Sequence, residues 1–80
     1  MQTLLEEFLI HEADDDVRSE LLSAIGQMKS GQRYFTYNTV NVLLDADRAT
    51  VTVEDELDVD RADTVSLEEF ESLLRRRNTP

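Results

Sequence analysis

Residues 34–54 read YFTYNTVNVLLDADRATVTVE, and this stretch decides the fold. Aromatic and β-branched residues, the types that favour strands, dominate both of its halves. Between the halves, the residues from Asp45 to Arg48 have the composition of a tight turn. We therefore predict a β-hairpin with one strand over 33–44, a second strand over 49–54 and a turn centred on Ala46-Asp47.

A turn at Ala46-Asp47 determines how the two strands pair. It sets Val42 opposite Val51 and Val40 opposite Val53, so that all four valines lie on one face, as a buried face requires. The other face is polar and pairs Thr39 with Glu54 and Asn41 with Thr52.

The predicted ribbon leaves some apolar side chains without cover. A two-stranded ribbon is only marginally stable by itself, and helices can cover only one of its faces. In this register Phe35, Tyr37 and Leu43 fall on the face opposite the valines. Either a bulge moves some of them inward, or that face meets another chain. We expect the second, a homodimer in which two ribbons together build a four-stranded sheet.

Helical spacing precedes the hairpin. Thr3-Leu4-Leu5-Glu6 has the pattern of a capping box, and apolar residues then recur at steps of three and four up to Met28. The run Asp14-Asp15-Asp16 interrupts this stripe, because aspartate favours N-caps and first turns over helix interiors. Residues 3–29 form either one long helix or two helices that meet near Ala13, and we favour two.

A final helix is predicted over 67–77. Ser66 is its N-cap, Glu69 can bond back to the Ser66 amide, and Val65 and Phe70 are spaced to pack across the cap. The last turn holds Arg75-Arg76-Arg77, where positive charge complements the helix dipole. The 80 residues are thus expected to form a single α+β domain (1–80) whose C-terminal helix packs on the valine face.

Composition restricts the classes of function. Eight Lys plus Arg against 18 Asp plus Glu give a net charge of −10, so the chain has little with which to neutralise phosphates, and direct nucleic-acid binding is not expected. A protein with a basic surface is the electrostatic complement. The alternative is that the acidity only keeps a small protein soluble.

Other features indicate a cytoplasmic, non-catalytic chain. There are no cysteines, and no apolar stretch approaches the ~18 residues of a membrane span. His11 is the only histidine and has no evident catalytic partner, and a glycine-rich phosphate loop is missing from the sequence. We expect no enzymatic activity, no cofactor and no membrane association.

The candidate partner-binding residues lie on the segment that leaves the hairpin, which we call the acidic segment. Its members are Glu54, Asp55, Glu56, Asp58, Asp60 and Asp63. Arg61 is the only basic residue among them. Such a segment can fill the basic groove of a nucleic-acid-processing enzyme by placing carboxylates where phosphates bind. The alternative interpretation is a solvated connector.

The same segment resembles the calcium loop of EF-hand proteins over about 13 residues. Asp58, Asp60, Val65, Ser66 and Glu69 occupy matching positions. Ala62 stands at the position of the third ligand, Asp63 replaces the glycine of the sharp turn, and a strand-like stretch replaces the entering helix. A calcium-binding module is therefore retained as an alternative function.

The layout also resembles small bacterial immunity proteins, which are paired with contact-dependent growth inhibition and related polymorphic toxins. The resemblance is carried by residues 40–45, 49–57 and 66–70, a hairpin strand that ends in acidic residues and is followed by a short capped helix. It implies stoichiometric neutralisation of a toxin domain, often a nuclease. A small structural or regulatory homodimer is the remaining alternative.

Overall fold

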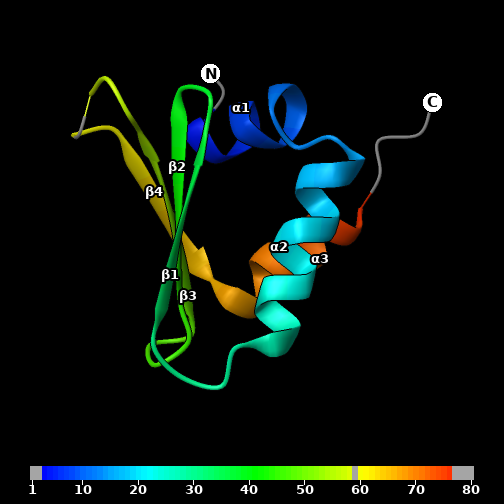
Figure 1. Ribbon diagram of the computed structural model, residues 1–80. Coiled ribbons are helices and arrows are strands. Elements are labelled where there is room, and N and C mark those ends of the chain that lie inside the picture. Colours follow the sequence, from blue (N-terminus) through cyan, green and yellow to red (C-terminus); the bar gives the residue numbers. More distant parts are fainter. Residues whose placement is uncertain (1–2, 59, 77–80) are drawn as a thin grey trace.

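The computed structural model describes residues 3–58 and 60–76. The elements in chain order are α1 (Leu4–His11), α2 (Asp15–Gln27), β1 (Gln32–Tyr37), β2 (Val40–Asp45), β3 (Thr50–Asp55), β4 (Ala62–Ser66) and α3 (Leu67–Arg75). The four strands form an antiparallel sheet in the order β1-β2-β3-β4, and the helices lie against one of its faces (Figure 1). The predicted α+β class is confirmed.

The N-terminal region forms two helices, as predicted. Thr3 and Glu6 make the capping box of α1: the Glu6 N–H donates to the Thr3 hydroxyl, and the Thr3 N–H donates to the Glu6 carboxylate at 3.0 Å. Asp14 caps α2 by accepting a hydrogen bond from the Val17 N–H at 2.9 Å. Ala13 is buried between the two helices.

The predicted strand over 33–44 is wrong, because the chain reverses at Asn38-Thr39. Tyr37 lies opposite Val40, so β1 and β2 form a hairpin of their own. Asn38 has a φ of 51°, a left-handed conformation that asparagine adopts more readily than most residues. This turn places Phe35 opposite Val42 on the face that the helices cover. The prediction that Phe35 and Tyr37 lie on the opposite face is therefore wrong.

The register of β2 with β3 also differs from the prediction. Val42 lies opposite Val53, two residues away from the predicted Val51. The loop has four residues, Ala46 to Ala49, and the Asp45 carboxylate braces it by accepting from the Arg48 N–H at 3.0 Å. A shift of two residues preserves the faces of a strand, so the predicted buried face, with Val40, Val42, Val51 and Val53, is confirmed.

The chain supplies a fourth strand that the sequence did not reveal. β4 pairs with residues Thr50–Glu54 of β3. It begins within the acidic segment, for which a solvated connector was the alternative interpretation. One chain therefore builds the four-stranded sheet that was predicted to need two chains. The face away from the helices carries Tyr34, Leu43, Thr52 and Thr64 in one cross-strand row. We call it the open face.

The C-terminal helix closes the core. Ser66 caps α3 by accepting from the Glu69 N–H at 3.0 Å, as predicted. Phe70 is fully buried, and its ring lies 6.5 Å from that of Phe8 on α1. α3 ends at Arg75, with Arg76 as its C-cap, and the predicted helical position of Arg77 lies outside the described residues.

A single arginine side chain ties the three helices together. The Arg18 guanidinium on α2 donates to the Leu9 carbonyl in the last turn of α1 at 3.1 Å and to the Ala13 carbonyl just after α1 at 2.7 Å. It also donates to three carbonyls at the end of α3, those of Leu73, Leu74 and Arg76. These helix-terminal carbonyls lack intrahelical partners, so one cation satisfies the ends of two helices.

Tyr37 joins β1 to α2, and this contact predicts a pH dependence. Burial, together with the bond that its hydroxyl donates to Glu20, raises the pKa of Tyr37 above its ordinary value of 10.0. Above about pH 10 the unfolded chain loses this proton while the folded chain keeps it, so the free energy of unfolding falls as pH rises. Urea unfolding at about pH 9 and about pH 11 should show a smaller fall for Tyr37→Phe than for the wild type. Equal falls would contradict this assignment.

Candidate functional site

The end of the sheet where β3 continues into β4 carries an exposed acidic loop, which we define as Glu56, Leu57, Asp58 and Asp60. All four residues are exposed, and Leu57 is 87% exposed. The Asp58 carboxylate accepts from the Asp60 N–H at 3.2 Å, which holds the tip in a tight turn. The Glu56 N–H donates to the Thr39 carbonyl at 2.9 Å. The acidic loop is thereby fastened to the β1–β2 turn.

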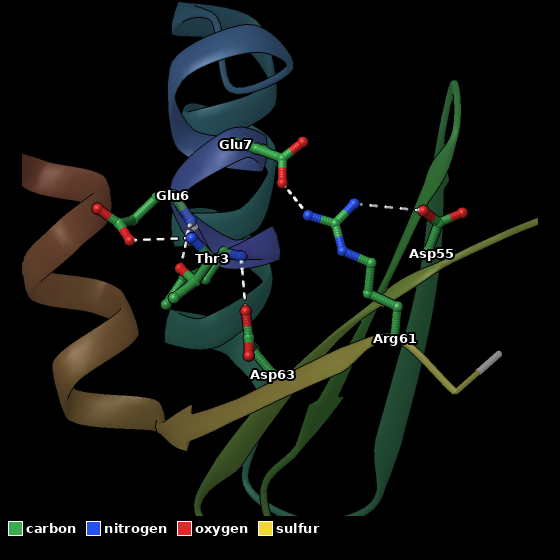
Figure 2. Close-up of polar contacts among 7 residues, drawn as sticks. Thr3, Glu6, Glu7, Asp55, Arg61 and Asp63 are labelled. Carbon is green, nitrogen blue, oxygen red and sulfur yellow. Dashed lines mark hydrogen bonds and ion pairs between the residues drawn. The ribbon is translucent and has the colours of Figure 1, made fainter. Parts of the chain in front are cut away.

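Other members of the acidic segment make contacts within the fold. The Asp63 carboxylate accepts from the Leu5 N–H at 2.9 Å, at the N-terminus of α1, where a negative charge is favourable (Figure 2). Glu54 points to the open face and accepts a hydrogen bond from the Tyr34 hydroxyl. The acidic segment is therefore divided between the two faces of the sheet, and only its middle part forms the exposed loop.

Arg61 connects the loop to the N-terminal helix. Its guanidinium forms an ion pair with Glu7 on α1 and lies 3.7 Å from the Asp55 carboxylate on β3 (Figure 2). Because the Arg61 side chain is 43% exposed, water screens these pairs, and each contributes at most about 1 kcal/mol. Arg61 thus orients α1 against the β3–β4 hairpin without a large contribution to stability.

A cavity of about 120 Å³ lies between α1, the β1–β2 turn and the end of β3. Its apolar lining consists of Leu4, Phe8 and Val40, and its polar lining consists of Glu7, His11, Glu12, Thr39, Asp55 and Arg61. Glu12 is positioned by a hydrogen bond from the Asn38 side-chain amide at 3.2 Å. The cavity is smaller than the ~300 Å³ at which small-molecule pockets begin, and its size suits a single side-chain head group.

The charges around the cavity favour a cationic guest. Three carboxylates, those of Glu7, Glu12 and Asp55, line it together with one arginine and one histidine. Arg61 pairs with Glu7 and Asp55, so among the described lining residues the Glu12 carboxylate is the one that a cationic guest would meet without a cation beside it. Sequence reasoning identified Asp55 but missed Glu7 and Glu12, because they join the site only through the docking of α1. The capping box of α1 was a usable signal for the helix, but no local signal indicated where that helix packs.

The structure does not form the EF-hand loop that the sequence resembles. Between Asp60 and Ser66 the chain runs as strand β4, and five extended residues cover about 16 Å, at roughly 3.3 Å per residue. Asp58 and Asp60 are therefore held apart from Ser66 and Glu69, the other residues at ligand positions. Within residues 3–58 and 60–76, no group of three or more His, Cys, Asp or Glu side chains is placed to hold a metal ion.

Comparisons with family models, with curated proteins and with solved structures find no match for this chain. In the part of the chain that the structure describes, every helix is too short or too polar to cross a membrane. The basis for a functional proposal is therefore the geometry of the acidic loop and of the cavity beside it.

Proposed function

We propose that this chain is a non-catalytic protein-binding domain that holds a partner with a basic surface at the acidic end of its sheet. The carrying observation is that the acidic loop and the carboxylate-lined cavity adjoin each other, because the Glu56 N–H bonds to Thr39, a lining residue. Among the described residues, no arginine or lysine forms an ion pair with Glu56, Asp58 or Asp60. Their negative charge is available to a partner.

In this proposal the two parts of the site have different tasks. The exposed acidic loop attracts a basic partner and accelerates encounter. An arginine or lysine of the partner then enters the cavity beside Glu12, while Leu57 packs against apolar surface of the partner. A buried anchor surrounded by contacts that exclude water is the usual organisation of an interface hot spot.

The class of partner that this arrangement fits best is a nuclease domain. The groove of a nuclease is basic because it binds phosphates, and carboxylates on a loop can occupy the same positions. The resemblance to immunity proteins of polymorphic toxin systems supports the same class. The chain would then act as a stoichiometric inhibitor in the cytoplasm of the cell that makes the toxin.

Neutralising the loop should weaken binding of the partner. Asp58→Asn/Asp60→Asn removes two negative charges but keeps an acceptor for the turn, so folding should be unchanged. We expect the affinity to fall about tenfold or more, equivalent to ~1.4 kcal/mol. Calorimetry would use the purified protein encoded beside this chain's gene, at low and at physiological salt.

A matched control separates local from overall charge. Ser23→Lys/Gln27→Lys makes the same change in net charge at two exposed positions of α2, away from the acidic loop. Its affinity should stay within about twofold of the wild type, since distant surface charges are screened. Equal losses for both variants, or a neighbouring gene product that does not bind, would contradict the proposal.

A further inference from the structure

β1 is an edge strand whose only charged residue is Arg33. It lies at the end of the sheet order, and its six residues pair with β2 without a break in register. Edge strands are commonly protected by proline, by a bulge or by several charged side chains, and Gln32–Tyr37 has no proline, no bulge and one charge. Most of its residues are exposed. β1 therefore offers a regular backbone template to a further strand.

The backbone groups that point outward can be assigned. The Gly31 carbonyl accepts from the Ala46 N–H, so Gly31 and every second residue after it direct their N–H and C=O groups towards β2. Tyr34 and Thr36 alternate with these residues, and their N–H and C=O groups point away from the sheet. An added antiparallel strand would pair with these two residues.

The charges along β1 are arranged so that two antiparallel copies of the strand would be electrostatically complementary. Gln32–Tyr37 contains no acidic residue, although the chain carries a net charge of −10. At one end the Arg33 guanidinium lies over the Phe35 ring, 5.2 Å from its centroid. At the other end Tyr37 donates to the carboxylate of Glu20. The edge is thus positive at its start and negative at its end.

We propose that two copies of this chain form a symmetric dimer through β1, joining their four-stranded sheets into one sheet of eight strands. A two-fold axis at Phe35 places Phe35 of one copy opposite Phe35 of the other. Arg33 then lies opposite Tyr37 of the second copy, beside that copy's Glu20, and symmetry repeats the contact. Tyr34 and Thr36 of the two copies form the hydrogen-bonded pairs, and all helices lie on the same face.

The other edge does not suit a second copy. β4 follows directly from the acidic loop and leads into the acidic first turn of α3, so a symmetric antiparallel pairing there would bring Asp58 and Asp60 of one copy towards Glu68 and Glu69 of the other. Pairing through β1 keeps both acidic loops at the outer ends of the long sheet. The proposed dimer interface on β1 is therefore separate from the acidic loop, which lies beside the opposite edge strand of each sheet.

A charge-swap series tests the pairing in the full chain. An interface made by one edge strand is small, so we expect a dissociation constant on the order of 10 μM. Sedimentation velocity should show Arg33→Glu and Glu20→Arg each associating at least tenfold more weakly than the wild type. The double variant Arg33→Glu/Glu20→Arg restores opposite charges and should recover dimerisation. Circular dichroism of each variant establishes that it is folded.

Single cysteines test the register, since the chain has no native cysteine. Oxidation of Phe35→Cys should give a disulfide-linked dimer, because facing residues at the axis lie about 4.5 Å apart in Cα position, within disulfide reach. Tyr34→Cys should cross-link much more slowly, because its neighbour across the interface is Thr36. A wild type that is monomeric at about ten times the expected constant would overturn the proposal. A double variant without recovery, or faster cross-linking at Tyr34, would also overturn it.

Discussion

Val53→Asp is expected to leave the chain unfolded. Val53 is fully buried, and it lies between Val42 on β2 and Asp63 on β4. The new carboxylate would be buried without a cation and beside an existing carboxylate. The cost is several kcal/mol, comparable to the about 5–15 kcal/mol that stabilises a whole domain. Far-UV circular dichroism and the dispersion of amide proton shifts would show the loss of structure.

The neighbouring position provides the control for this experiment. Thr52→Asp introduces the same charge one residue earlier, on the open face, where its hydroxyl now lies 3.0 Å from that of Thr64. We expect it to cost no more than about 1 kcal/mol, as is usual for surface substitutions. A folded Val53→Asp variant, or equal losses for the two substitutions, would show that the assignment of the faces is wrong.

Arg18→Ala is expected to produce the second largest loss of stability. The substitution removes donors from five carbonyl oxygens at the ends of α1 and α3. Hydrogen bonds from a charged group contribute about 1.5–3 kcal/mol each, but water can replace those at the surface. We therefore expect a total loss of about 2–4 kcal/mol in the free energy of unfolding, measured by urea denaturation.

Two further variants identify the cause of that loss. Arg18→Lys keeps the charge but lacks the planar fork of donors, so its stability should lie between those of the wild type and Arg18→Ala. Arg75→Ala removes an exposed arginine whose pairing with Glu71 spans 3.9 Å, and it should cost less than about 0.5 kcal/mol. If Arg18→Ala costs no more than Arg75→Ala, the guanidinium is not what holds the helix ends.

Local chemistry made much of the fold predictable. The helix starts at Thr3, Asp14 and Ser66 follow from side chains that cap the backbone N–H groups next to them. The buried face of β2 and β3 follows from alternation of valine with polar residues, and this alternation survives an error of two residues in the register. Both signals depend on residues close together in the chain.

The missed features depend on conformations and contacts that local patterns do not specify. The β1–β2 turn uses Asn38 in a left-handed conformation without a glycine or proline, so the strand pattern runs on without a visible break. β4 was hidden because the acidic residues before it suggested a connector. The cavity and the contacts of Arg18 with α3 join residues more than 50 positions apart, as in the bond from Arg18 to the Leu74 carbonyl.

The open face has a consequence for how this protein can evolve. At Thr36, Asn41 and Thr52 the side chains meet water on one side of the sheet, and many polar residues that tolerate an extended backbone would serve there. At Val42 and Val51 the surrounding volume admits few replacements. Neighbouring residues within one strand are therefore under weak and strong purifying selection in turn. Substitutions in β2 and β3 would accumulate mainly at every second residue.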